Sequence, residues 1–360
     1  MKESRVRKTL VQISTLAVLM FVTYYLIMRD RDFHQVMRVL EDSSKFWLIV
    51  AFLFMGVYVF CGGWCIRVLM KPLGRHVSVW RCFKYSLIEI YFSAITPSNT
   101  GGQPMQLIYM SRDGMPKADS TVVLIAVTVL YKAAFLIITA LLFLLGIGYI
   151  SGPISSVWFL AVLGTALNVA LIVFLLILLF NRRLTDVFIK GSIRLLGKMH
   201  IVKDVPGKLA EFEEKLSNYH RCAGFFMTHK LVVLKAFGVL TLQRFALLSI
   251  TLWVYFSLGV RGYTVLEILA TQCLLNLCVD LMPLPGAVGI SETVFLMLFT
   301  PIFTEAKITT AVLLSRGISF YVLVVVAAIA VMGIQIAGIF RRDPAAESIA
   351  SSEEEEDGLL

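Results

Sequence analysis

The sequence predicts an all-α integral membrane protein with about six full transmembrane helices plus two re-entrant helical hairpins, arranged as an inverted repeat. Three observations lead to this prediction. Of the 360 residues, 58% are hydrophobic and only 16% are charged, whereas soluble domains carry about 25% charged residues. Eight stretches have the length and apolar character of membrane segments, for which about 20 residues are needed. Two of these stretches are interrupted by Pro and Gly, and this pattern predicts the hairpins.

The first apolar stretch predicts a retained helix and not a cleaved signal peptide. It is too long for a signal-peptide core, and no small-residue cleavage site follows it. The other stretches are separated by polar loops of varied length. In order, the eight stretches are residues 10–28, 46–69, 85–111, 118–147, 156–180, 230–258, 264–303 and 308–340.

The connecting loops predict the orientation in the membrane. The segment 181–229 carries nine Lys or Arg residues against five acids, and the loop 70–84 carries four basic residues and no acid. Cytoplasmic loops of membrane proteins are enriched in Lys and Arg. Basic residues also dominate the N-terminus and follow the last helix as Arg341 and Arg342. All four regions are therefore expected on the cytoplasmic side, together with both termini.

A parity argument then favours the hairpins. If all eight stretches crossed the membrane fully, the loop 70–84 would lie inside and the segment 181–229 outside. If 85–111 and 264–303 each enter and return on one side, every basic region lies inside. Irregular backbone at membrane depth is tolerated where it is packed in protein or lines a wet cavity. Broken segments at corresponding places in two halves are typical of transporters with a site between the halves.

The predicted domain organisation is one polytopic membrane domain over residues 1–340, followed by a disordered acidic tail over 341–360. Its two halves span roughly 10–180 and 181–340. The segment 181–229 includes an amphipathic helix, predicted from apolar residues at helical spacing opposite charged ones.

Six charged residues fall deep inside apolar stretches, where charge is costly and marks functional sites. Three are cationic and three are anionic, so pairing within the protein is the alternative to a role in binding. The six residues are Glu89, Lys132, Arg244, Asp280, Glu292 and Arg316.

The two interruptions predict a binding site for phosphate or carboxylate. A short helix restarts after each break, near Gln103 and Ser291, and a helix start presents free N–H groups and partial positive charge. The alternative is that both turns are only tight bends. The site predicted for a lipid headgroup comprises Gly101, Gly102, Gln103, Lys132, Arg244, Gly286, Gly289, Glu292 and Arg316, with Glu89 and Asp280 as buried acids beside it.

The sequence carries no motif for catalysis, metal binding or nucleotide use. It lacks a Walker loop, a His-Glu-x-x-His pair and a Gly-x-Ser-x-Gly elbow. The cysteines lie mostly in apolar stretches without histidines at ligand spacing, so we expect neither metal nor cofactor. The net charge of +9 is attributed to basic cytoplasmic loops and not to a nucleic-acid partner.

At both interruptions the sequence resembles a known family, the flippase-like membrane region of lysylphosphatidylglycerol synthases, also named multiple peptide resistance factors. The stretch Pro97-Ser98-Asn99-Thr100-Gly101-Gly102-Gln103-Pro104 resembles the motif Pro-x-x-x-Gly-Gly-Glu-Pro. The stretch from Pro283 to Glu292 is similar to Pro-x-Pro-Gly-Gly-x-Gly-x-x-Glu. Arg316 matches a recurrent Arg of the last helix. The resemblance covers roughly residues 10–340.

The chain departs from the family pattern at three places. Gln103 replaces a Glu, Ala287 replaces a Gly, and Tyr131-Lys132 stands where relatives often carry Glu-Arg. The chain also ends about 20 residues after its last predicted helix, without the soluble aminoacyl-transferase domain of the full synthases. The resemblance therefore implies a stand-alone form that moves lipids and is not itself an enzyme.

The function expected from these features is translocation of an anionic phospholipid or a polyprenyl-phosphate-linked lipid between the leaflets of a bacterial-type cell membrane. The expected partners are membrane lipids. Two alternatives remain open at this point. The protein is a membrane subunit or partner of a separate glycosyl- or aminoacyl-transferase, or it is a scaffold that transports nothing.

Overall fold

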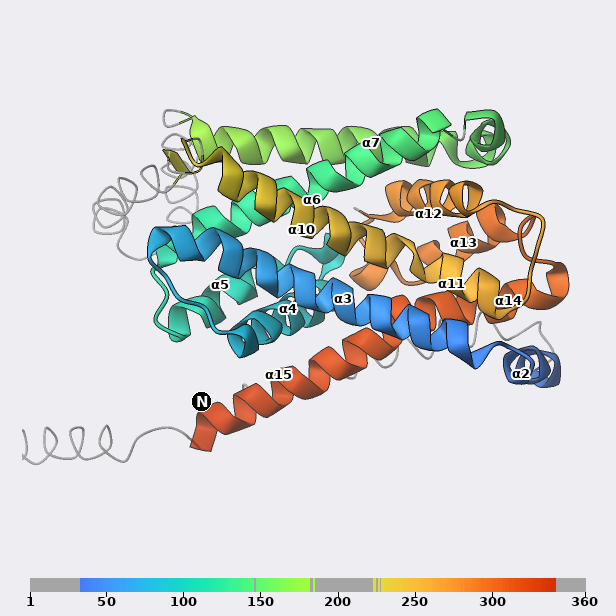
Figure 1. Ribbon diagram of the computed structural model, residues 1–360, viewed down its shortest axis with the longest axis horizontal. Helices are drawn as coiled ribbons and strands as arrows, with labels where there is room; N and C mark the ends of the chain where they lie inside the picture. Colours follow the sequence, from blue (N-terminus) through green and yellow to red (C-terminus); the bar gives the residue numbers. More distant parts are fainter. Residues whose placement is uncertain are drawn as a thin grey trace, which may run out of the picture.

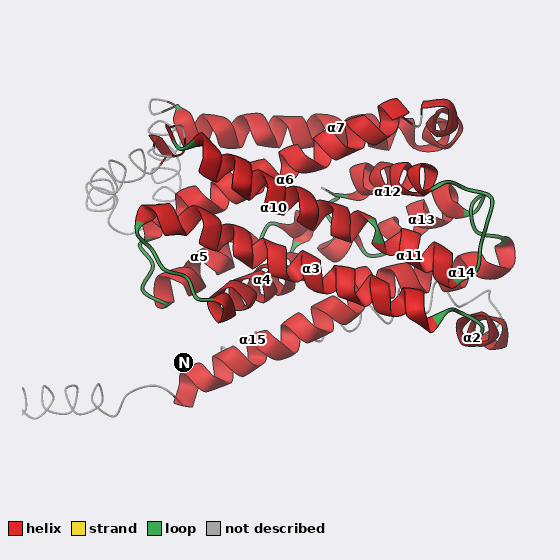
Figure 2. Cartoon of the chain, viewed as in Figure 1, coloured by secondary structure: helices red, strands yellow, loops and turns green. Residues whose placement is uncertain are grey.

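The computed structural model describes residues 33–145, 147–181, 184, 223–224, 226, 228–280 and 282–340. Within these ranges every regular element is a helix (Figure 2). The predictions for the stretch 10–28, for nearly all of 181–229 and for the tail 341–360 lie outside the described residues.

Five described helices are long and apolar enough to span a bilayer. Each is 24 to 31 residues long, which exceeds the ~20 residues that a helix needs to cross ~30 Å of hydrocarbon. They correspond to five of the six predicted crossings, and the sixth is the stretch 10–28. The chain is therefore a multi-pass helical membrane protein. The five spans are Lys45–Leu73, Lys117–Leu145, Val157–Phe180, Lys230–Ser257 and Glu305–Gln335.

The first half places a helical hairpin between long spans (Figure 1). A short helix precedes the first long span, and the interruption within the hairpin forms a 3₁₀ turn. The elements are α2 (Phe33–Glu41), α3 (Lys45–Met70), the 3₁₀ turn η1 (Lys71–Leu73), α4 (Val79–Ala94), η2 (Pro97–Asn99), α5 (Gly102–Arg112), α6 (Lys117–Leu145) and α7 (Ile147–Phe180).

The second half repeats the order of span, hairpin and span. Its last span contains a π-helical turn, η4. The elements are α10 (Lys230–Leu248), α11 (Ile250–Ser257), α12 (Val265–Val279), the 3₁₀ turn η3 (Pro285–Ala287), α13 (Ile290–Phe299), α14 (Glu305–Arg316), η4 (Gly317–Tyr321) and α15 (Val322–Phe340). The helices that follow the two breaks begin at Gly102 and Ile290, one residue from the predicted restarts.

The first hairpin begins and ends at one end of the molecule. Lys84, near the start of α4, donates to both carboxylate oxygens of Asp113 at 2.7 and 2.8 Å, just after α5. The hydroxyl of Tyr85 donates to the same carboxylate at 2.8 Å. Beside them Arg75 forms an ion pair with Asp119 at 3.0 Å. These contacts hold the start of α4 and the loop before it against the end of α5 and the start of α6.

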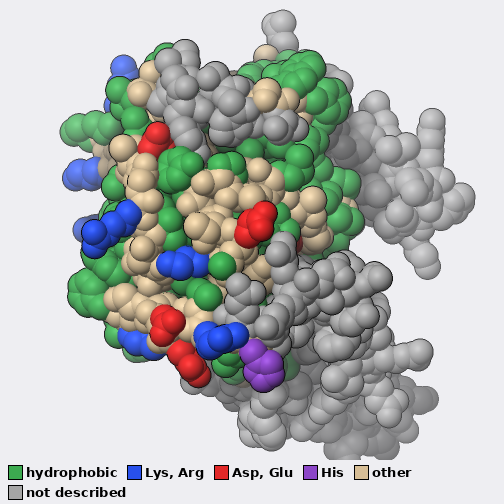
Figure 3. All heavy atoms as spheres, turned by 90° about the vertical axis from the view of Figure 1, so that its right-hand side faces the viewer, with side chains coloured by type: hydrophobic (Ala, Val, Ile, Leu, Met, Phe, Trp, Pro, Cys, Tyr) green, Lys and Arg blue, Asp and Glu red, His purple; other side chains and the backbone are tan. Residues whose placement is uncertain are grey.

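The two hairpins enter the molecule from opposite ends. In Figure 1, α4 and α5 lie toward the left and α12 and α13 toward the right. Their turns η2 and η3 contact each other. Figure 3 views the right-hand end, where charged and polar atoms lie among hydrophobic side chains that gather around the sides. The inverted repeat of the two halves stays a prediction that this arrangement fits.

Close approaches between helices depend on glycines at two places. A Cβ added to Gly63 of α3 would lie 2.1 Å from the carbonyl oxygen of Cys82 in α4. A Cβ added to Gly164 of α7 would lie 1.8 Å from the carbonyl oxygen of Leu277 in α12. Only glycine, which has no Cβ, allows these backbones to touch. Small residues are common at such contacts between membrane helices.

The breaks adopt strained backbone conformations. Among described non-glycine residues, positive φ occurs only at Ser98 (52°), Asn99 (55°) and Ala287 (51°). The left-handed region is unfavourable for side chains with a Cβ. The backbone at 287 therefore suits the Gly of the family motif better than the Ala of this chain.

Candidate functional site

A cavity of about 510 Å³ lies between the two halves of the molecule. Helices of both halves and both breaks form its wall. Neutral polar side chains make up much of this wall, including Ser86, Ser93, Asn99, Gln103, Gln106, Thr128, Gln243, Thr251, Gln272, Asn276, Ser291, Ser315 and Ser319.

The structure brings most of the predicted site residues to this cavity. Four of the eleven, Gly101, Gly102, Gly289 and Glu292, do not line it, although Glu292 contacts the lining residue Arg316. The seven that line the cavity are Glu89, Gln103, Lys132, Arg244, Asp280, Gly286 and Arg316.

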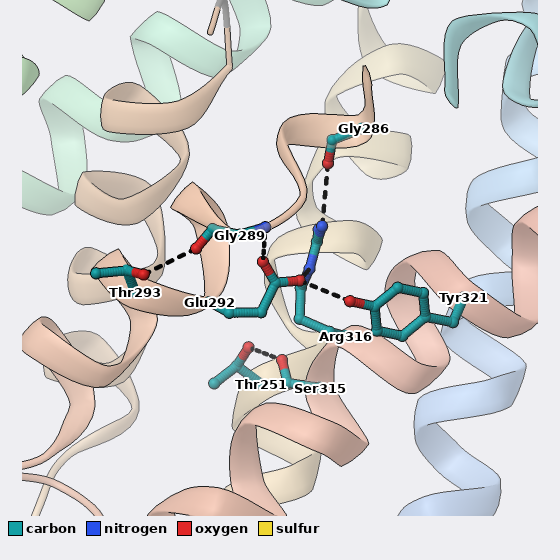
Figure 4. A network of polar contacts seen from close by, with 8 residues as sticks. All are labelled: Thr251, Gly286, Gly289, Glu292, Thr293, Ser315, Arg316 and Tyr321. Atoms are coloured by element: carbon teal, nitrogen blue, oxygen red, sulfur yellow. Dashed lines mark hydrogen bonds and ion pairs between the residues drawn. The ribbon is translucent and has the colours of Figure 1, made fainter. Parts of the chain in front are cut away.

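Glu292 organises the second break (Figure 4). Its carboxylate accepts a hydrogen bond of 2.7 Å from the backbone N–H of Gly289 and one of 2.9 Å from the hydroxyl of Tyr321. Arg316 donates to the same carboxylate at 2.9 Å and to the carbonyl oxygen of Gly286 at 3.0 Å. A carboxylate from within the protein thus caps the start of α13 through the Gly289 N–H, where the sequence predicted a bound phosphate or carboxylate.

Most glycines of the breaks face protein atoms. A Cβ added to Gly286 would lie 2.1 Å from the ring of Phe320, and one added to Gly102 would lie 2.2 Å from the hydroxyl oxygen of Ser93. Gly289, with φ of +87°, has open space in that direction. Packing of the turns accounts for Gly102 and Gly286 without a ligand. The guanidinium of Arg316 lies 4.5 Å from the Phe320 ring centre, which completes this cover.

Lys132 and Asp280 form an ion pair that joins the two halves. The ammonium nitrogen of Lys132, on α6, lies 2.5 Å from a carboxylate oxygen of Asp280, directly after α12. The two side chains are 9% and 16% exposed. Together with Arg316 and Glu292, this pair neutralises four of the six charges that the sequence placed at membrane depth.

Arg244 is the cation of the cavity wall that has no carboxylate partner within the described residues. It is 3% exposed. Its Nη1 donates to the hydroxyl of Tyr131, and its guanidinium lies over the rings of Tyr131 and Phe135, 4.0 and 4.3 Å from their centres. Its Nε and Nη2 have no hydrogen-bond partner among described residues. A buried charge without a partner is costly, so Arg244 is suited to receive an anion.

The start of α5 differs from the start of α13 because no carboxylate caps it. Gln103 stands there in place of the family's Glu, and its Oε1 is buried without a hydrogen-bond partner among described residues. The hydroxyl of Thr96 accepts a hydrogen bond of 2.8 Å from the N–H of Gly101. This end of the cavity therefore carries one negative charge fewer than the family motif would supply.

Sequence reasoning missed a polar face on α12. Asn276 and Gln272 lie about one and two turns before Asp280, respectively, and line the cavity with it. Gln243 lines the cavity beside Arg244, and Gln106 lies one turn after Gln103. Polar residues repeating every three or four positions in an apolar stretch are the signal that would have identified them.

No group of His, Cys, Asp or Glu in the described ranges is arranged to hold a metal ion. The five cysteines of these ranges, Cys61, Cys65, Cys82, Cys273 and Cys278, are buried free thiols.

A comparison with protein families decides where the chain belongs. The family model of the lysylphosphatidylglycerol synthase TM region matches residues 10–327. The chain belongs to this family. The match begins at the first predicted crossing and includes both hairpins and every cavity residue named above. No curated protein matches the chain. Membership of this family fits a lipid-related function within the membrane.

Proposed function

We propose that the protein translocates a lipid between the two leaflets and that the cavity holds its anionic phosphate headgroup. Arg244 carries this proposal, because it is buried in the cavity wall and two of its guanidinium nitrogens have neither a hydrogen-bond partner nor a carboxylate in direct contact among the described residues. Arginine suits phosphate because its planar fork donates parallel, charge-assisted hydrogen bonds. A bound phosphate would give the Arg244 guanidinium the direct anionic partner that no described residue provides.

Two further features support the proposal. The exposed large apolar side chains on the outer faces of the spans, such as Leu53 and Ile329, suit contact with acyl chains. The polar cavity between the halves offers the headgroup partners that hydrocarbon lacks. The lipid class is an anionic phospholipid or a polyprenyl-phosphate-linked lipid, and the compartment is a bacterial-type cell membrane with both termini on the cytoplasmic side.

The test is translocation of a labelled phosphatidylglycerol by the purified protein in liposomes. We expect Arg244→Ala to slow translocation at least roughly tenfold, because a charge-assisted hydrogen bond contributes about 1.5–3 kcal/mol. Its melting temperature should change little, since no carboxylate loses a partner. The matched control is Arg261→Ala, which removes an exposed arginine from the loop after α11 and should translocate normally.

Full translocation by a folded Arg244→Ala protein would contradict the headgroup site. If the wild type moves lipid only when a separate transferase is added, the result would favour the alternative function of a transferase partner. Absence of translocation under both conditions would favour a scaffold.

A further inference from the structure

The charges around the cavity balance when the cavity holds no ligand. Three cations and three anions surround it, counting Glu292 through its bond to Arg316, so the formal charge is zero. Two ion pairs account for four of these charges. The remaining two are Arg244 and Glu89, and neither forms an ion pair with another described residue.

Glu89 lies in α4, the helix that leads into the first break. It accepts a hydrogen bond of 3.2 Å from the hydroxyl of Ser93. A Cβ added to Gly102 would lie 2.7 Å from its carbonyl oxygen and 3.2 Å from its Cγ, so α5 packs closely on it. Its counterpart before the second break, Asp280, is held by Lys132, whereas Glu89 has no such cation.

Several helices around the cavity place charged or titratable side chains opposite Glu89. None of the cavity-lining residues of α5, η4 and α15 is charged or titratable. The titratable and charged residues of the remaining wall are Tyr58 on α3, Tyr131 and Lys132 on α6, Arg244 on α10, Asp280 after α12 and Arg316 on α14.

We propose that Glu89 binds one proton whenever the cavity takes up an anionic headgroup, so that the protein moves a lipid anion and a proton together. The proposal rests on the function inferred above, in which the cavity holds a phosphate. The proton comes from water on the side where the lipid enters, bonds to a carboxylate oxygen of Glu89, and returns to water on the other side. No bond of the lipid forms or breaks.

The physical reason is charge balance in a medium of low dielectric. With Glu89 ionised, a phosphodiester in the cavity would bring the formal charge from zero to minus one. Two negative charges in one poorly screened cavity repel strongly, and a net charge at membrane depth is costly. A proton on Glu89 removes the repulsion and restores neutrality, and the protonated carboxyl group also gains a hydrogen-bond donor for the ligand.

Coupled movement has a thermodynamic signature at equilibrium. A neutral lipid–proton pair follows a pH gradient and ignores the membrane potential. One pH unit is a tenfold ratio of proton activity, so labelled phosphatidylglycerol should reach an approximately tenfold excess in the leaflet on the alkaline side. A potential of about 60 mV should leave the distribution even, although it would drive an uncompensated anion approximately tenfold toward the positive side.

The experiment measures the leaflet distribution of labelled phosphatidylglycerol in proteoliposomes under either gradient. We expect the wild type to respond to pH alone. Glu89→Gln, which cannot ionise, should lose the pH response and respond to the potential. Glu89→Asp should keep the pH response. The matched control is Glu305→Gln, an exposed acid at the start of α14, which should behave as the wild type.

The results separate this inference from the proposed function. If no variant and no wild-type protein moves lipid without a gradient, the proposed function fails. If the wild type moves lipid but its distribution follows the potential or ignores pH, the coupling is overturned. A retained pH response in Glu89→Gln would show that another group carries the proton. Because the wild-type response decides the coupling by itself, poor folding of a variant does not rescue the proposal.

Discussion

The buried cations of the cavity differ in what their removal leaves behind. Arg244 forms no ion pair with another described residue, so its loss breaks none. Lys132 neutralises Asp280 at 2.5 Å across the two halves, and its loss leaves a mostly buried carboxylate unpaired. The same type of substitution is therefore expected to have different consequences at these positions: loss of the proposed headgroup binding at Arg244 and loss of stability at Lys132.

We predict that Lys132→Ala lowers the free energy of unfolding substantially. Breaking one partner of a buried ion pair costs about 3–5 kcal/mol because the other charge remains buried. The double variant Lys132→Ala/Asp280→Ala should lose less stability than the sum of the two single variants. Thermal unfolding in detergent measures all three proteins. The control is the exposed Lys117→Ala, and additive losses in the double variant would contradict the pairing.

Individual residues show where the sequence stops being informative. The charges inside apolar stretches could be predicted as candidate site residues, because the cost of burying a charge can be recognised in the sequence. Their partners were not, because Lys132 and Asp280 are 148 positions apart and only the fold makes them neighbours. The cover of Gly286 by Phe320 was hidden for the same reason.

At the scale of elements, α7 and α12 pack where one glycine lets two backbones touch. A methyl group at position 164 would lie 1.8 Å from the carbonyl oxygen of Leu277, a rigid backbone atom that cannot rotate away. The helices must then separate, although α12 carries the polar face of the cavity.

We predict that Gly164→Ala destabilises the protein, by about 1–3 kcal/mol as for other overpacked sites. Gly56→Ala is the matched control, because Gly56 is exposed in α3 and an added Cβ meets nothing within 4 Å. Differential scanning calorimetry of the two purified variants gives the melting temperatures to be compared. Equal melting temperatures would show that α7 and α12 tolerate a wider spacing than the structure has.

Elements were more predictable than their contacts. The restarts after both breaks were predicted to within one residue, because Pro and Gly interrupt helices by local chemistry. The apolar stretch 308–340 gave no sign of the π-helical turn at Gly317–Tyr321. That turn lies against the second break through Phe320, and tertiary packing of this kind leaves no periodic pattern in the sequence.

For the whole molecule, the arrangement of the hairpins makes a topological prediction. Residues on either side of α4 and α5, such as Lys71 and Lys117, should face the same compartment, and Arg261 after α11 should face the other. All three are exposed. We expect single cysteines at 71 and 117 to react from the cytoplasmic side and one at 261 from outside, in a background without native cysteines.

Labelling of intact and inverted vesicles with a membrane-impermeant maleimide shows from which side each cysteine reacts. If the cysteines at 71 and 117 react from opposite sides, α4 and α5 cross the membrane as one span and the hairpin model is wrong.

The lengths of α5 and α13, the second helices of the two hairpins, have a consequence for the distance that a headgroup would travel in the proposed function. α5 has 11 residues and α13 has 10, which correspond to ~16 Å and ~15 Å at 1.5 Å per residue. Each is about half of the ~30 Å hydrocarbon thickness. If the two hairpins start at opposite membrane surfaces, as we propose, helices of this length would place the turns η2 and η3, which contact each other, close to mid-depth. In the proposed function, a headgroup arriving from either surface would then cross about half of the bilayer before it reaches the cavity, and the two parts of its route would be nearly equal in length.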